Sequence, residues 1–189
     1  MKIKRKDVEP VPEPREVIES REHTDDKKYY EEIVKTMPLL IEWANDEIRD
    51  DKSIMLDAVK VDGGALEFAS DRLKDDKDVL LAAVAQAGWT ACYASNRLKD
   101  NKDVMITASK NDGQVLYFAS EKLRDDKDVV LAAVSQKSII LKYASLRLRK
   151  DKDVAIAALN QSKKCLEYID EELQKDEDIQ KIVNPPEEN

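Results

Sequence analysis

A repeat of 25 residues constrains the fold of this chain more than any other feature. The unit that starts at residue 76 is DKDVLLAAVAQAGWTACYASNRLKD, and the next unit, from residue 101, is NKDVMITASKNDGQVLYFASEKLRD. Asp or Asn opens every unit in the same register: Asp26, Asp51, Asp76, Asn101, Asp126, Asp151 and Asp176. A fixed period of this length indicates an array of similar structural units, each stacked on the next.

The first half of each unit has the features of a short helix. In the third unit we expect this helix at about residues 77–86, with Asp75 or Asp76 as its N-cap. Gly88 follows where the helix should stop, at a position that favours positive φ. Gly63 and Gly113 take the same place in neighbouring units. The glycines are helpful rather than required, because other units have proline, serine or lysine there.

The second half of each unit also has helical spacing. Leu66, Ala69 and Leu73 recur at intervals that place them on one helix face, so a second helix is expected at about residues 89–99 of the third unit. Alternation with a period of two, which would indicate strands, is absent. We therefore predict an all-α fold, an α-solenoid of six tandem 25-residue helical hairpins with a C-terminal half-repeat cap.

Columns of equivalent residues define the expected core. A helix of ten residues is only about 15 Å long and marginal alone, so it must be buried by its neighbours. The aromatic column, expected in the core, contains Trp43, Phe68, Tyr93, Phe118, Tyr143 and Tyr168. The aliphatic column contains Ile54, Val79, Val104, Val129, Val154 and Ile179. The alanine column, which would let helix axes approach closely, contains Ala58, Ala83, Ala108, Ala133 and Ala158.

Three segments are expected along the chain. Residues 1–25 should form an extended N-terminal arm, because its prolines lie among charged residues. Residues 26–184 should form the repeat domain, and residues 185–189 a C-terminal tail. Polar Gln180 and Lys181 replace the residues equivalent to Ala155 and Ile156, as a capping unit requires.

The DKDV, AAV and YAS segments resemble the repeats of the DUF4116 family. The resemblance is close from Lys52 to about Leu173 and weakens in the first unit, which lacks AAV and YAS. It implies a helical repeat of the kind found in bacteria, protists and some large DNA viruses or phages. The family has no assigned activity, so the resemblance transfers no catalytic residue.

Charge and composition exclude several classes of protein. The net charge is −8, and nucleic acids and anionic membranes both bind basic surfaces. No run of 18 apolar residues exists, and the N-terminus lacks the apolar stretch of a secretory signal. Two cysteines favour a reducing compartment. We expect an intracellular protein, either cytoplasmic or within a viral or organellar assembly, that binds no nucleic acid and no membrane.

Reactive side chains recur with the repeat, which favours structural roles over catalysis. Asp-x-Asp pairs occur in several units, where N-capping and ion pairs with Lys77, Lys102, Lys127 and Lys152 explain them. His23 is the only histidine, so a histidine-based triad is excluded. Cys165 is expected in the core and Cys92 partly exposed, too far apart for a disulfide. We predict no catalytic residue, no metal site and no cofactor, and therefore no enzyme.

Three groups of residues are candidates for contact with a protein partner. Leu39, Trp89 and Ile139 form either an exposed apolar stripe or fillers of gaps between hairpins, and the sequence favours neither alternative. Arg97 and Arg147 belong to a basic ladder that either pairs with neighbouring aspartates or binds anions. Pro10, Pro12 and Pro14 lie in the N-terminal arm, which would act as a tether to a partner.

The expected function follows from these candidates. A non-enzymatic scaffold for protein–protein interaction is favoured, with a larger assembly such as a virion or an organellar complex as one setting. The alternative is a regulatory or effector module that binds a client protein through its charged faces.

Overall fold

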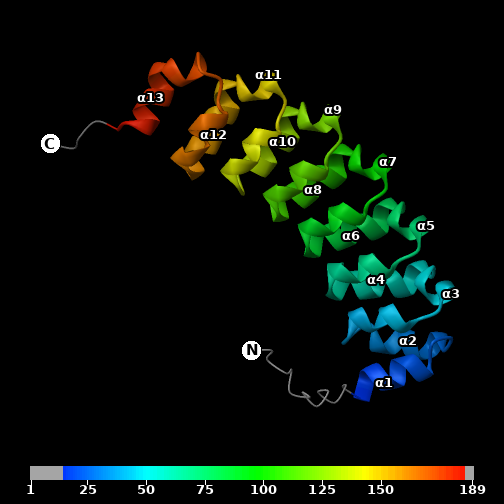
Figure 1. Cartoon of the computed structure of the whole chain (residues 1–189). Coiled ribbons are helices and arrows are strands. Elements are labelled where there is room, and N and C mark those ends of the chain that lie inside the picture. Colours follow the sequence, from blue (N-terminus) through cyan, green and yellow to red (C-terminus); the bar gives the residue numbers. More distant parts are fainter. Residues whose placement is uncertain (1–14, 186–189) are drawn as a thin grey trace, which may run out of the picture.

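The protein is a curved array of helices in a computed structural model that describes residues 15–185 (Figure 1). Each repeat contains a long α-helix, a six-residue 3-10 helix and a final short turn, which is α-helical in the first five repeats and a 3-10 helix in the sixth. Within residues 15–185 there is no strand, so the all-α solenoid is confirmed. No helix in this part of the chain is long and apolar enough to cross a membrane.

The elements follow one another with the period of the sequence. The long helices are α2 (Lys27–Ile33), α4 (Lys52–Val61), α6 (Lys77–Gln86), α8 (Lys102–Asn111), α10 (Lys127–Val134) and α12 (Lys152–Gln161). The 3-10 helices are η1 (Pro38–Trp43), η2 (Gly63–Phe68), η3 (Gly88–Tyr93), η4 (Gly113–Phe118), η5 (Ser138–Tyr143) and η6 (Lys163–Tyr168). The one-turn helices are α3 (Asp46–Arg49), α5 (Asp71–Lys74), α7 (Asn96–Lys99), α9 (Glu121–Arg124) and α11 (Leu146–Arg149). Helix η7 (Leu173–Lys175) ends the sixth repeat, helix α1 (Arg15–Glu22) precedes the first repeat, and α13 (Glu177–Val183) follows the sixth.

These elements form two rows with the core between them. Each of the helices from α4 to α12 contacts the next long helix, and each 3-10 helix contacts the next 3-10 helix. The one-turn helices lie along the outer edge of the arc (Figure 1). The aliphatic and alanine columns of the long helices are buried throughout, as predicted.

Helix starts and the last half-repeat agree with the sequence. Helix α6 spans the predicted residues 77–86, and the Asp76 carboxylate accepts hydrogen bonds from the N–H groups of Asp78 (3.0 Å) and Val79 (3.2 Å). In α13, Ile179 is buried while Gln180 and Lys181 are exposed. The half-repeat therefore covers the last full repeat with a polar outer face.

The expected second helix is broken into two, which corrects the sequence prediction. Helix η3 ends at Tyr93, Ala94 is extended (φ −60°, ψ 148°), and the α-helix α7 starts at Asn96. The break is stabilised by Ser95, because its hydroxyl oxygen accepts a hydrogen bond from the Leu98 N–H (3.3 Å) as an N-cap. The same serine N-cap begins α5, α9 and α11.

The glycines before the 3-10 helices have a different role from the one predicted. Within residues 15–185 no glycine has positive φ. A Cβ on Gly63 would lie 2.5 Å from the carbonyl oxygen of Ala83, and a Cβ on Gly88 equally close to that of Ala108. Glycine is needed there because the backbone of the next long helix passes too close for a side chain.

The aromatic column is not in the core. Residues of this column, from Trp43 to Tyr168, are only half-buried, and those from Phe68 onward pack against the edge of the core. Because each ring lies at the end of its 3-10 helix, one face of it stays at the surface of that row. The column was expected in the core, and its rings from Phe68 onward instead pack against the edge of the core.

Part of the expected extended arm is helical. Residues 15–22 form α1, which packs on η1. The buried Tyr30 hydroxyl donates to the carbonyl oxygen of Ser20 (3.1 Å), and the Arg21 guanidinium lies 4.0 Å from the centroid of the Trp43 ring. Pro10, Pro12 and Pro14 lie outside the described residues, as does the tail from residue 186.

Ser109 offers a direct test of the core. It is fully buried in α8, its hydroxyl has no hydrogen-bond partner, and Val59, Val84 and Val134 occupy its place in other repeats. Because an unpaired buried hydroxyl costs about 1–3 kcal/mol, Ser109→Val should raise the melting temperature by several degrees in thermal denaturation. Thr90→Val is the control, since the buried Thr90 hydroxyl donates to the Ala87 carbonyl (2.7 Å). A stabilisation of the same size at Thr90 would contradict this reasoning.

The glycine contacts predict a difference between two adjacent types of glycine. Gly88→Ala should destabilise by about 1–3 kcal/mol, because the new methyl group meets backbone atoms of α8. Gly64→Ala is the matched control, since the nearest atoms to its Cβ belong to side chains, with Asp62 Oδ1 at 3.0 Å and the Leu39 and Trp89 side chains at 3.7 Å. Chemical denaturation measures both variants. Equal losses would show that close backbone approach is not the reason for glycine.

Candidate functional site

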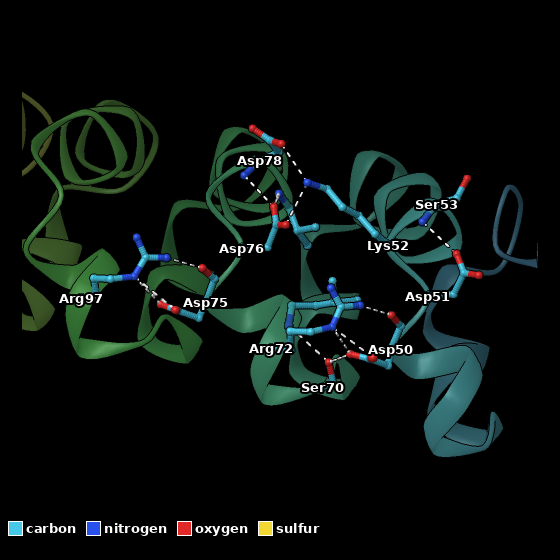
Figure 2. Close-up of polar contacts among 12 residues, drawn as sticks. Asp50, Asp51, Lys52, Ser53, Ser70, Arg72, Asp75, Asp76, Asp78 and Arg97 are labelled. Atoms are coloured by element: carbon cyan, nitrogen blue, oxygen red, sulfur yellow. Dashed lines mark hydrogen bonds and ion pairs between the residues drawn. The ribbon is translucent and has the colours of Figure 1, made fainter.

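Lysines at the start of the long helices join each repeat to the next. Lys52 bridges the Asp76 and Asp78 carboxylates of the following repeat at 2.8 Å each (Figure 2). The hydrogen bonds to these carboxylates raise the pKa of Lys52. Equivalent pairs are Lys27–Asp51, Lys77–Asp103, Lys102–Asp126 and Asp128, Lys127–Asp151 and Asp153, and Lys152–Asp176 and Asp178. The Asp-x-Asp pairs are thus N-caps and ion-pair partners, as predicted.

A second polar contact joins the one-turn helices. The Ser70 hydroxyl donates to the Asp50 carboxylate of the previous repeat, and Arg72 Nε donates to the same carboxylate at 2.9 and 3.1 Å (Figure 2). The Ser70 hydroxyl and the Arg72 guanidinium hold the pKa of Asp50 below its usual value. The equivalent groups are Asp75 with Ser95 and Arg97, Asp100 with Ser120 and Lys122, and Asp125 with Ser145 and Arg147.

The last of these contacts has its charges reversed. Lys150 occupies the aspartate position and Asp170 the serine position, and Lys150 Nζ lies 3.3 Å from Asp170 Oδ2. Asp170 also accepts from the Glu172 N–H (3.2 Å). An ion pair therefore joins this boundary too, although both residue types differ from those at the earlier boundaries.

The basic ladder pairs with the aspartates of the preceding repeats. Arg97 and Arg147 donate to the side-chain and backbone oxygens of Asp75 and Asp125, with Nη2 2.6 Å from the backbone oxygen in each case. Pairing with neighbouring aspartates is therefore confirmed.

The apolar residues Leu39, Trp89 and Ile139 lie on the surface of the 3-10 row. Their exposed fractions are 47%, 45% and 42%. The side chains of Leu39 and Trp89 approach the same glycine, Gly64, from either side. Both alternatives from the sequence thus hold in part, since the residues border the gaps between repeats and still face solvent.

A hollow on this surface extends from η3 to η5. It has a volume of about 530 Å³, and Trp89, Gln114, Ile139 and Tyr143 lie along it. Tyr117, which the sequence analysis did not single out, is 59% exposed, and its ring centroid lies 5.2 Å from that of Tyr143. The charged lining residues are Asp112, Lys137 and Lys142. We call this surface the aromatic groove.

Other reactive side chains are scattered. Cys165 is buried and Cys92 half-buried, both as free thiols, as expected. His23 is exposed and stacks on Tyr29, with ring centroids 5.0 Å apart. Between residues 15 and 185, no group of three or more histidine, cysteine or acidic side chains is arranged to hold a metal ion.

The sequence matches one family, described as a domain of unknown function, DUF4116. The family pattern fits five overlapping stretches, at residues 26–74, 54–99, 76–124, 101–149 and 126–174. The chain belongs to the DUF4116 family. Each DUF4116 match of about 49 residues covers two repeats, and the matches include the first repeat, where the resemblance is weakest in sequence. Comparisons with curated proteins and with solved structures gave no match for this DUF4116 chain.

The aspartate contact predicts a pH-dependent effect on stability. The Ser95 hydroxyl and the Arg97 guanidinium lower the pKa of Asp75. Because the pKa of Asp75 is lowered in the folded protein, its ionised carboxylate stabilises the fold fully at pH values above the ordinary aspartate pKa near 3.9. This stabilisation is lost as the pH falls through the lower pKa of the folded protein. Asp75→Asn should therefore melt about 1–4 °C below the wild type at pH 7. The difference should vanish near pH 2.

Thermal denaturation between pH 7 and pH 2 measures this convergence. Asp71→Asn is the control, because Asp71 is exposed at the start of α5. A gap between wild type and Asp75→Asn that stays constant with pH would contradict the role of the carboxylate.

Proposed function

We propose that this protein is a non-enzymatic scaffold that binds a protein partner through the aromatic groove. The observation that carries the proposal is the exposure of Trp89, Tyr117 and Ile139 along one hollow. Exposed apolar patches mark interaction sites, and Trp and Tyr are enriched among residues that dominate binding energy. Polar Gln114 and the charged lining residues supply a rim for specificity.

The stacked repeats support this role because they present the groove on a preformed surface. The aromatic side chains are positioned by three consecutive 3-10 helices, and each helix is held to the next by packing. A rigid surface loses little conformational entropy on binding. Extended surfaces built from several repeats are the usual binding sites of solenoid proteins.

Recurring ion pairs support a scaffold over an enzyme. The aspartates, lysines and serines that could do chemistry are N-caps or partners across a repeat boundary. Cys165 is a buried free thiol and Cys92 a half-buried one. Free thiols fit an intracellular setting, which is part of the proposal. A structural role within a larger assembly fits the same surface.

Substitution in the groove should separate binding from folding. Trp89→Ala combined with Tyr117→Ala should weaken partner binding by at least about tenfold, since both side chains are exposed and available to a partner. Their melting temperature should stay within a few degrees of the wild type. Affinity capture from the cells that express the protein, followed by titration of the captured partner, measures the change.

Leu146→Ala is the matched control for this experiment. Leu146 is the most exposed of the large apolar residues, at 72%, and it lies on α11, outside the groove. The control should capture the same proteins as the wild type. Identical capture by the groove variant would contradict the proposed function.

A further inference from the structure

We infer that the aromatic groove binds the proline-rich segment at residues 8–14 of a second copy of this chain. The inference rests on the proposed function, because it takes the groove as a docking surface and names its occupant. The segment is VEPVPEP and lies outside the described residues. Three features support the pairing: the chemistry of the groove, its charge, and the reach of the chain.

The chemistry of the groove suits proline. Aromatic side chains from three successive repeats line it, with Trp89, Tyr117 and Tyr143 among them. The Trp89 ring lies 5.9 Å from that of Tyr93 and edge-on to it, at 69°. Grooves lined by aromatic rings are the usual receptors for polyproline II segments, which bind without losing much conformational entropy.

The segment matches this requirement in its sequence. Proline fixes φ near −65° and disfavours helix in the residue before it, and residues 8–14 contain three prolines at alternate positions. In a polyproline II helix of three residues per turn, Val8, Val11 and Pro14 fall on one edge. Seven residues extend about 22 Å, which matches two helix spacings from η3 to η5, about 16–20 Å.

The charges of the two surfaces are complementary. Glu9 and Glu13 flank the prolines. Lys137, Lys142 and Asp112 line the groove, so its lining carries a net positive charge, and neither lysine has an ion-pair partner between residues 15 and 185. Lys142 Nζ lies 4.9 Å from the Tyr143 ring centroid, at the same end of the groove. These two lysines contrast with those of the repeat ladder, which are paired.

The reach of the chain requires a second copy. Helix α1 starts at Arg15 and packs on η1, in the first repeat. Pro10 precedes Arg15 by five residues, which span at most about 18 Å. The centre of the groove, at η4, is three helix spacings from η1, about 24–30 Å. Binding between the segment of one copy and the groove of another is a head-to-tail contact, which produces open chains or rings.

The test uses the full chain and a labelled peptide of residues 6–15, KDVEPVPEPR. Fluorescence anisotropy should give saturable binding in the micromolar range, weakened at least about tenfold by Trp89→Ala with Tyr117→Ala and unchanged by Leu146→Ala. A peptide with alanine at all three proline positions should bind equally weakly. Absence of binding at millimolar peptide, or binding that the groove variant leaves unchanged, would overturn the inference.

Exchanging the charges of the peptide and the groove tests whether the glutamates of the segment pair with the lysines of the groove. A peptide with Glu9→Lys and Glu13→Lys should bind the wild-type chain more weakly. The same peptide should regain binding to a full chain that carries Lys137→Glu and Lys142→Glu. In sedimentation of the full chain, mass should rise with concentration, and alanine at Pro10, Pro12 and Pro14 should abolish the rise. A mass that stays monomeric at every concentration would also overturn the inference.

The two proposals fail separately. If the peptide does not bind but the groove variant still loses its captured partner, the inference falls and the proposed function stands. If the peptide binds and capture is unchanged by the groove variant, the groove serves self-association and the proposed function falls.

Discussion

Burial of apolar surface between consecutive repeats is the interaction on which the structure depends. A ten-residue helix is marginal alone, and each of the helices α4 to α10 contacts a long helix on either side. The contact is close because glycine faces alanine backbone, with no room for a methyl group at Gly63 or Gly88. Stability is therefore a property of neighbouring repeats together and increases from the ends toward the middle.

Two sets of polar contacts cross this interface near the turns that join the one-turn helices to the long helices. The Lys52 bridge and the Asp50 group lie on different elements, so together they define which helix meets which across each boundary (Figure 2). Exposed ion pairs add little free energy individually, and their value here is specificity of stacking. At the last of these boundaries the basic residue, Lys150, lies on the earlier repeat and the acidic residue, Asp170, lies on the later one. The charged residues of these contacts thus have partners within the array.

Much of the fold could be predicted from the sequence because the repeat supplies aligned columns. The limits of α6, its aspartate cap and the buried aliphatic columns all follow from period and spacing. The break at Ala94 could not be separated from a continuous helix, because Leu66, Ala69 and Leu73 fit either. The serine after each such alanine was the available signal, since serine is a preferred N-cap.

The candidate site was only partly predictable for a related reason. Trp89 and Ile139 stood out because their column alternates between apolar and polar residues. Tyr117 belongs to a column of mixed residues, Glu67, Cys92 and Lys142 among them, so no pattern marked it. The glycine contacts were missed because they involve the backbone of the next repeat. Helix α1 was missed because three prolines dominate the composition of the segment before it.

Amide hydrogen exchange in a core variant tests most directly whether neighbouring repeats stabilise one another. Met105 is fully buried in α8, and Met105→Ala should cost about 2–5 kcal/mol. If the account is correct, mass spectrometry should show faster exchange in α6 and α10 as well as in α8, with α13 affected least. Faster exchange confined to α8 would contradict it, because the repeats would then be stable independently of one another.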